Sequence, residues 1–381
     1  MKKIYLDYAA ATPADPRVVK KIQPYFSKNF GNANSIHGFG REAKKDLEKS
    51  RKIIADVIKA GANEIIFTSS ATESNNFALK GVAFANTDKG KHIIVSSVEH
   101  KCILEAASWL KKQGFKITFL PVDKNGLVSP SDVKHTIRKD TVLVSVMHVN
   151  NEIGTIEPIG EIGKICREQG VFFHTDAAQT FGIMPIDVNR QNIDLLTAGG
   201  QKIYGPKGGA CLYIRAGVKI DSLLHGGGHE MGLRSATVNT GAVVGMALAA
   251  EFDRKEAKGY LEKMEQLRVY FIESIKKNIK DVVINGHPTK RLPNIINITF
   301  QKADSEALLL ELDRRGIAVS AAAACLAKDG GGSDVLRACG LSEKDNRASI
   351  RFSLGKPTTK AEIDYVLKIL PVAVEKIRRL I

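Results

Sequence analysis

The sequence predicts an α/β protein with a larger part built on a mostly parallel sheet and a smaller α+β part. Two observations support this prediction. Between residues 64 and 215, short apolar runs alternate with helical segments, which is typical of a layered sheet covered by helices. After about residue 240 the pattern changes to one long helix followed by a shorter, mixed set of strands and helices. A chain of 381 residues is long enough to form two cores.

The first elements follow from local signals. Residues 1–12 have extended character, and Asp15 before Pro16 is a typical helix start, because a capping acid precedes a proline at the first helical position. Residues 31–38 combine turn formers with polar side chains and indicate a surface loop, and an amphipathic helix over 41–59 follows. The central strands are expected at 64–68, 92–97, 116–122, 141–149, 171–176, 195–198 and 209–215.

The C-terminal third has fewer and more mixed elements. We expect a large domain of residues 13–255 and a small domain made of residues 1–12 and 256–381, joined by a long helix rather than by a flexible linker. The expected elements of this region are helices at 241–277, at 305–315 and from 359, and strands at 294–300, 317–320 and 349–354.

Composition is that of an ordinary soluble globular protein, with 44% hydrophobic and 25% charged residues. The N-terminus reaches Asp7 before an apolar segment can form, so no secretory signal is expected. The longest apolar run, 241–252, contains Glu251 and is too short to span a bilayer. We therefore expect a cytoplasmic protein without a membrane segment.

Cysteine content and net charge restrict the possible partners. Five cysteines without CxxC spacing argue against a disulfide framework and against a metal site of the zinc type. The net charge of +15 favours an acidic partner or a polyanion, although dispersed basic residues fit a simple basic surface equally well. Aromatic and basic residues do not alternate as they do in single-strand binding proteins, so no direct nucleic-acid binding is expected.

Two polar residues, each at the end of a predicted strand, indicate the chemistry. Gly199 and Gly200 allow a tight bend after the strand at 195–198, which places Lys202 just beyond the strand end. Asp176 ends the preceding strand and suits an acid that holds a cationic ring nitrogen, as pyridoxal phosphate enzymes require. Alternatively, Asp176 is a helix N-cap before Ala177-Ala178-Gln179. An Asp and a Lys 26 residues apart, each closing a strand, favour the cofactor.

A third strand end suits a phosphate. Ser70-Ala-Thr-Glu73 has the form of a capping box at the start of a helix. The free N–H groups and positive dipole of such a start attract anions, and Ser70, Ala71 and Thr72 would line the phosphate site. A helix cap without any ligand is the alternative.

Many further segments extend this pattern through nearly the whole chain. Together they resemble the class-V aminotransferase group of fold-type I pyridoxal phosphate-dependent transferases, and most closely the cysteine desulfurases of the NifS/IscS family. The resemblance implies that the large domain binds the cofactor and that the small domain carries the catalytic cysteine loop. The matching segments are residues 5–13, 34–37, 67–76, 99–101, 147–154, 174–179, 201–208, 226–230, 233–235 and 349–355.

The resemblance implies a role for each candidate residue. Lys202 would bind pyridoxal 5'-phosphate covalently, Asp176 would hold its ring nitrogen, and His100 would stack on the ring and take part in proton transfer. Arg351 would bind the substrate carboxylate, as a planar guanidinium does well. The remaining expected contacts are Asn151 and Gln179 at the phenolic edge of the cofactor, Asn151 also at the substrate, Ala71, Thr72 and Gln201 around the phosphate, and Thr237 from the second subunit of a homodimer.

Three of these residues have simpler readings in isolation. His100 could be a histidine at a helix start, Asn151 a turn residue, and Arg351 an exposed charge on a strand.

Cys325 decides between possible reactions. It lies between a strand and a glycine-rich segment, so we expect a mobile loop whose thiol can approach a bound substrate. By the resemblance, the enzyme converts L-cysteine to L-alanine, leaves a persulfide on Cys325, and supplies sulfur for iron–sulfur cluster assembly or tRNA thiolation. The acceptor would be an acidic scaffold or another sulfur-accepting protein. The other four cysteines lie in contexts that favour buried, inert thiols.

The chain departs from the family pattern in three places. Gly199 and Gln201 stand where a serine and a histidine are usual, which removes a hydroxyl and an imidazole near the phosphate. Met231 stands where an arginine is usual, and residues 321–324 are alanines in place of Ser-Gly-Ser-Ala. These changes bear on cofactor affinity and on the loop, but they remove no expected catalytic group.

Two alternatives remain open from the sequence. One is another pyridoxal phosphate lyase or aminotransferase, acting on selenocysteine or cysteine sulfinate. The other is a catalytically silent scaffold for an iron–sulfur or tRNA-thiolation complex, against which the presence of Lys202, Asp176 and Cys325 counts.

Overall fold

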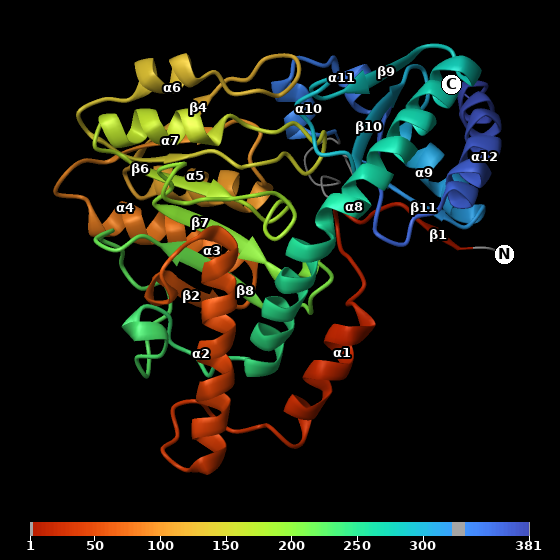
Figure 1. Ribbon diagram of the computed structural model, residues 1–381. Helices are drawn as coiled ribbons and strands as arrows, with labels where there is room; N and C mark the ends of the chain where they lie inside the picture. Colours follow the sequence, from red (N-terminus) through yellow and green to blue (C-terminus); the bar gives the residue numbers. More distant parts are fainter. Residues whose placement is uncertain (1–2, 322–331, 381) are drawn as a thin grey trace.

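The computed structural model describes residues 3–321 and 332–380. Figure 1 shows two parts, a large one with a central sheet and a smaller one near both chain ends, connected by the long helix α8 (Thr240–Asn278).

The large part contains a seven-stranded sheet in the order β2-β8-β7-β6-β5-β3-β4. All neighbours pair in parallel except β8, which is antiparallel to both β2 and β7. The predicted mostly parallel sheet is therefore confirmed. Its strands are β2 (Ile65–Thr68), β3 (His92–Ser96), β4 (Lys116–Leu120), β5 (Thr141–Ser145), β6 (Phe172–Asp176), β7 (Leu195–Gly199) and β8 (Ala210–Ile214).

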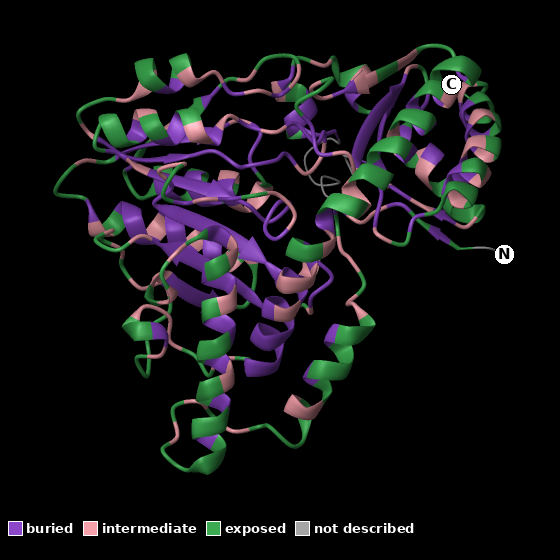
Figure 2. Ribbon diagram, viewed as in Figure 1, coloured by how far each residue is buried: buried purple, intermediate pink, exposed green. Residues whose placement is uncertain are grey.

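Apolar side chains cover both faces of this sheet, because successive residues of a strand point to opposite faces. Along β3, Ile94 belongs to one core cluster, and Ile93 and Val95 belong to another. Figure 2 shows the central strands as buried and the outer helix faces as exposed. The helices around the sheet include α1 (Pro16–Ile22), α2 (Gly38–Ile58), α5 (Lys101–Lys112), α6 (Pro130–Thr136) and α7 (Ile159–Glu168).

The smaller part has an antiparallel four-stranded sheet in the order β12-β13-β10-β9. Next to it, β1 (Ile4–Tyr5) pairs in parallel with β11 (Ile317–Ala318). The other elements are β9 (Val282–Asn285), β10 (Ile295–Phe300), β12 (Ser320–Ala321) and β13 (Ser349–Ser353), with helices α9 (Ser305–Arg314), α10 (Asp334–Ala338), α11 (Glu343–Asn346) and α12 (Lys360–Arg378).

Helix α8 contributes to both cores. Its first turns place Val243 and Met246 in a core of the large part, while Met264 and Phe271 pack in the small part. The expected domain boundary after residue 255 falls between these two groups, and we retain it as a proposal.

Local signals predicted most elements, with two corrections. The single strand expected at 317–320 is two short strands, because β11 pairs with β1 and β12 pairs with β13. Strand β9 was not predicted. Its four residues are too few to show a periodic pattern, and its pairing with β10 holds it in the sheet.

Candidate active site

The carboxyl ends of several strands meet at one edge of the large sheet. Strands β6 and β7 are parallel neighbours, with Asp176 paired to Thr197, so their last residues lie at the same edge. Strand β2 is antiparallel to β8, which is itself antiparallel to β7, so β2 also ends there. Ligands of open α/β sheets bind outside such strand ends. This edge brings together the segments that begin at Ser70, Asp176 and Gly200.

Lys202 lies in η4 (Gly200–Lys202), directly after β7, as the two glycines predicted. Its Nζ donates a hydrogen bond of 2.7 Å to the Ala9 carbonyl and another to the Ala10 carbonyl. Burial and, to a smaller extent, the nearby charge of Arg351 lower the pKa of Lys202 to about 8. Asp7 and Asp176 act in the opposite direction. The amine is thus a much better nucleophile at neutral pH than a solvated lysine.

Asp176 is 6% exposed at the end of β6. Its Oδ2 accepts a 2.7 Å hydrogen bond from the Asn75 amide, and its Oδ1 accepts one of 2.8 Å from the Ala178 N–H. The helix N-cap alternative is wrong, because a turn and not a helix follows β6, although one oxygen does cap the first N–H group of that turn. The other oxygen faces Asn75 on the helical segment that follows β2, so the carboxylate also has a role beyond its own turn.

The expected phosphate cup is the start of a helical segment that runs from Ala71 to Ala85 through α3 (Ala71–Asn76), η3 (Phe77–Gly81) and α4 (Val82–Ala85). Ser70 caps it by accepting from the Glu73 N–H at 3.1 Å. A β-carbon placed on Gly199 would lie 3.6 Å from the Ala71 β-carbon, so β7 ends beside this helix start. The first N–H groups of a helix have no partner within it, which leaves them available to an anion.

The capping box predicted at Ser70 is only half present. The Glu73 carboxylate accepts from the Ser69 N–H at 2.8 Å rather than returning to Ser70. Arg234 donates to the same carboxylate at 2.7 Å and holds it there, because a guanidinium is a stronger partner than a neutral amide.

His100 is the N-cap of α5, as its simpler reading suggested, and its ring is exposed. The surrounding protein nevertheless lowers the pKa of His100 by desolvation, with a further decrease from Lys202 and an increase from Asp176. Hydrogen bonds through Cys102 and Asn75 connect the ring to Asp176. Next to it, Glu99 is 2% exposed, and its burial raises the pKa of this carboxyl well above the usual range.

Arg351 projects from β13 in the small part and is 8% exposed, so its reading as an exposed strand charge is wrong. Its Nη2 pairs with Asp7 Oδ1 at 2.8 Å, and its Nη1 donates to the Asn151 carbonyl at 3.0 Å. Its Nε is buried and finds no hydrogen-bond partner among the described residues. The two expected substrate-binding residues are thus in direct contact, although Asn151 participates through its backbone within a turn.

The N-terminal segment, Asp7 to Thr12, connects these groups. The Ala9 carbonyl accepts from Gln179 Nε2 at 3.2 Å as well as from Lys202, and Asp7 binds Arg351. Thr12 donates both its N–H, at 3.1 Å, and its hydroxyl, at 2.9 Å, to the carbonyl of Gln201. Sequence reasoning assigned no role to this segment, because its contribution is mainly backbone carbonyls.

Thr237 lies apart from this group. It is exposed and lines a separate hollow of about 200 Å³ together with Tyr25, Phe26 and Phe30.

Cys325, the expected sulfur acceptor, lies outside the described residues, as do Ala322 to Ala324. Of the remaining departures, Met231 is 54% exposed and Ala321 pairs with Ile350 in the small sheet.

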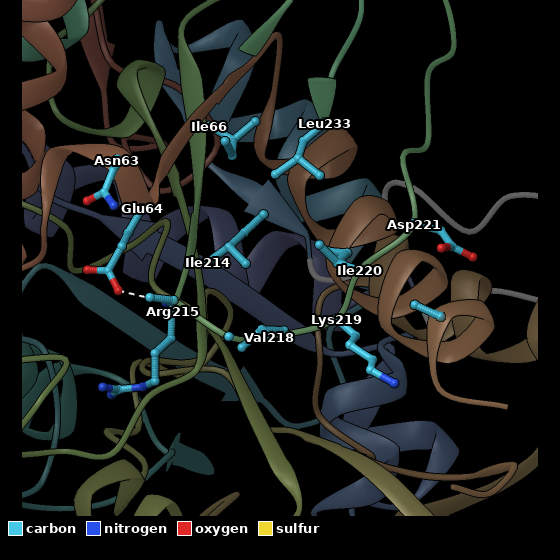
Figure 3. Close-up of a pocket in the computed structure, with 13 residues that line it drawn as sticks. Asn63, Glu64, Ile66, Ile214, Arg215, Val218, Lys219, Ile220, Asp221 and Leu233 are labelled. Carbon is cyan, nitrogen blue, oxygen red and sulfur yellow. Dashed lines mark hydrogen bonds between the residues drawn. The ribbon is translucent and has the colours of Figure 1, made fainter. Parts of the chain in front are cut away.

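A larger hollow of about 510 Å³ lies elsewhere on the large part (Figure 3). There Glu64 accepts from the Ala216 N–H at 2.8 Å, and Ile66, Ile214 and Leu233 supply apolar side chains. None of the expected site residues lines it, so size alone does not mark the site.

The described residues show neither a metal site nor a membrane helix. Within 3–321 and 332–380, no three metal-binding side chains converge. Over the same ranges, no helix combines the length and apolar character needed to cross a bilayer.

Comparison with known proteins places the chain in a family. A model of the aminotransferase class-V family matches residues 4–366. The chain is 48% identical over 377 residues to cysteine desulfurase IscS of Dictyoglomus turgidum, covering 99% of this chain and 96% of that protein. It is 47% identical over 379 residues to cysteine desulfurase IscS of Methanosarcina thermophila, covering 100% of this chain and 94% of that protein.

Solved structures of similar proteins support the same family assignment. A NifS-like protein superposes with a TM-score of 0.93 at 35% identity, covering 98% of this chain and all (100%) of that chain. SspA in complex with cysteine superposes with a TM-score of 0.84 at 37% identity, covering 94% of this chain and 100% of that chain. The expected fold-type I architecture is confirmed. The chain belongs to the cysteine desulfurase family of the class-V aminotransferase group.

Proposed function

We propose that this chain is a pyridoxal phosphate-dependent cysteine desulfurase that converts L-cysteine to L-alanine and transfers the sulfur to Cys325 as a persulfide. The observation that carries the proposal is the meeting of Lys202, Asp176 and His100 at one sheet edge, with Arg351 facing them from the small part. Membership of the cysteine desulfurase family supports the reaction, and the relative solved with bound cysteine supports the substrate.

The residues present fit the cofactor. Asp176 offers a buried carboxylate for a ring nitrogen, Lys202 an amine of lowered pKa for the aldehyde, and Ala71 and Thr72 a helix start for the phosphate. We expect Asn151, Gln179, Gln201 and, from a second subunit, Thr237 to complete the contacts. Gly199 and Ala71 carry no polar side chain, so at these two positions only backbone N–H groups can contact the phosphate. Bound pyridoxal phosphate supplies the electron sink for chemistry at the substrate Cα.

Arg351 binds the carboxylate of L-cysteine. Its present partners are Asp7 and the Asn151 carbonyl, and its free Nε leaves donor capacity for a second carboxylate. A buried guanidinium that already has a counter-ion is held in one orientation before substrate arrives, which reduces the ordering cost of binding.

Lys202 moves the proton. With a pKa near neutrality, its amine, once free, accepts the substrate Cα proton and returns it to carbon, and the Ala9 carbonyl keeps the amine oriented. Asn75 and Ala178 hold the Asp176 carboxylate in one orientation beside the reacting groups.

Cys325 takes the sulfur. Its thiolate attacks the substrate sulfur, an S–S bond forms, and the C–S bond of cysteine breaks with its electron pair left on carbon, which gains a proton and becomes the alanine methyl group. The persulfide then passes to an acceptor for iron–sulfur cluster assembly or tRNA thiolation. The net charge of +15 is compatible with an acidic acceptor, such as a scaffold protein. A cytoplasmic location remains a prediction, which cell fractionation would test.

An exposed aromatic surface supports a homodimer. Phe26, Phe30, Ile36 and Phe39 are 81%, 66%, 90% and 58% exposed, and the Phe30 and Phe39 rings stack with centroids 5.6 Å apart. Monomeric proteins rarely expose such a patch, and Thr237 lines the adjoining hollow, as a residue shared with a second subunit would. Ile36→Asp with Phe30→Asp should give a monomer in sedimentation analysis. Val372→Asp, at a position 62% exposed on α12, is the matched control.

The test of the activity compares products and cofactor in one experiment. With L-cysteine and a thiol reductant, the wild type should release alanine and sulfide in equal amounts. Cys325→Ala should bind the cofactor and release neither. Persistent alanine release by this variant would favour the lyase alternative, and a colourless, inactive wild type would favour the scaffold alternative.

A further inference from the structure

We propose that Cys102 is a positioning residue for His100, and that its thiol and backbone N–H both donate to His100 Nδ1, so that neutral His100 carries its proton on Nε2. The thiol sulfur lies 3.0 Å from Nδ1, and the Cys102 backbone nitrogen lies 3.2 Å from it. A backbone N–H can only donate, so Nδ1 must present its lone pair. The family resemblance gives His100 a part in proton transfer, and the present proposal, which rests on the proposed function, specifies which ring nitrogen carries the proton.

The thiol is itself held by a chain of donors. Asn75 Nδ2 donates to the Cys102 sulfur at 3.2 Å and to Asp176 Oδ2 at 2.7 Å, which uses both of its hydrogens. The reverse orientation of this amide would place an oxygen against the Asp176 carboxylate, so the amide can adopt only one orientation. The sulfur therefore accepts from Asn75 and has its own hydrogen left to give to Nδ1.

Burial keeps that hydrogen on sulfur. The pKa of Cys102 is raised to about 12, mainly by desolvation and then by the charge of Asp176, with a small further increase from Glu99. Hydrogen bonds from Asn75 and Thr72 oppose this increase without cancelling it. Cys102 is thus bonded to Thr72 of the phosphate cup and is connected through Asn75 to Asp176, the acid that would face the ring nitrogen.

The consequence is a defined role for His100. In this tautomer, Nε2–H is a hydrogen-bond donor, and protonation of the ring would have to occur at Nδ1, where two donors already point. Hydrogen bonds made to a neutral group disfavour its charged form. Lys202 lowers the pKa of His100 in addition, while Asp176 opposes the decrease. Near neutral pH, His100 polarises a bound group through Nε2–H rather than removing a proton from it.

Histidine-selective ¹⁵N labelling tests this directly, with the His100 signals assigned by their loss in His100→Gln. Wild type should show the proton on Nε2 throughout the neutral range. In Cys102→Ala the His100 pKa should rise by about 0.5 to 1 unit, because the neutral ring loses the hydrogen bond that the thiol donates to Nδ1. Cys102→Ser, which restores a donor, should return the pKa toward the wild-type value. Cys339→Ala, which removes a buried thiol in a different apolar cluster, should leave it unchanged.

A wild-type proton on Nδ1 would overturn the proposal. So would a His100 pKa in Cys102→Ala equal to that of wild type, or one in Cys102→Ser equal to that of Cys102→Ala. The readout needs neither substrate nor turnover, so it separates a failure of this proposal from a failure of the desulfurase assignment, which the product assay tests.

Discussion

The lowered pKa of Lys202 gives a quantitative prediction. Burial is the largest cause, and Arg351 is the second. At pH 7 a lysine with a pKa of about 8 is neutral in about 9% of molecules, compared with about 0.03% at the ordinary value, a difference of about 300-fold. The amine of Lys202 should therefore react with a small acylating reagent at neutral pH far faster than a solvated lysine.

Competitive acetylation of the cofactor-free protein, followed by peptide mass spectrometry, measures the reaction rate of Lys202 relative to that of other lysines. The acetylation rate of Lys202 should rise with pH to a midpoint near 8, and the exposed Lys207 provides the reference profile in the same digest. A Lys202 profile that coincides with that of Lys207 would refute the electrostatic reasoning.

Two variants separate the contributions of Arg351 and Asp7 to the pKa of Lys202. Arg351→Gln removes a cation and should raise the midpoint, whereas Asp7→Asn removes an anion and should lower it. Because these two side chains pair with each other at 2.8 Å, the double variant should lie between the single ones. Shifts of the same sign in both single variants would show that loosened packing, and not charge, controls this amine.

Two further predictions concern buried charges. Arg51 and Glu230 pair at 2.7 Å with side chains 5% and 2% exposed, and Glu230 also accepts from Phe67 in β2, so Glu230→Gln should cost about 3 kcal/mol of unfolding free energy in urea. Glu375→Gln, in an exposed pair, should cost less than about 1 kcal/mol, and equal losses would contradict the reasoning. Burial raises the pKa of Glu157 to about 8, so the folded state holds a proton that the unfolded state releases above its ordinary pKa. The stability of wild type relative to Glu157→Gln should therefore fall as pH rises from about 4.5 to 8, by up to about 1.4 kcal/mol per unit. The exposed Glu161→Gln serves as control, and a difference that does not change with pH would contradict the assignment.

Strand ends were the most informative sequence signal. Asp176 and Lys202 were singled out because each closes an apolar run, and the parallel pairing of β6 and β7 places those ends side by side. The helix start at Ala71 was also visible from local capping residues, although the partner of Glu73 was not. That partner, Arg234, is distant in sequence, and no local pattern indicates it.

The missing parts of the site depend on tertiary contacts. Asp7, Asn75 and Cys102 have no sequence feature that distinguishes them from ordinary surface or helix residues, and they acquire roles only from what they face. Asn151 and Ala9 act through backbone carbonyls, which every residue has. The burial of Arg351 likewise follows from the packing of β13 against the N-terminal segment, and its strand pattern alone did not predict it.

In the proposed reaction, the sulfur atom of L-cysteine is transferred to Cys325. The most direct measurement is peptide mass spectrometry of the cofactor-loaded protein after brief exposure to L-cysteine without reductant. We predict the added mass of one sulfur atom on the peptide that contains Cys325, together with an equal amount of alanine. Alanine formed without that mass, or the extra sulfur on Cys102 instead, would contradict the account.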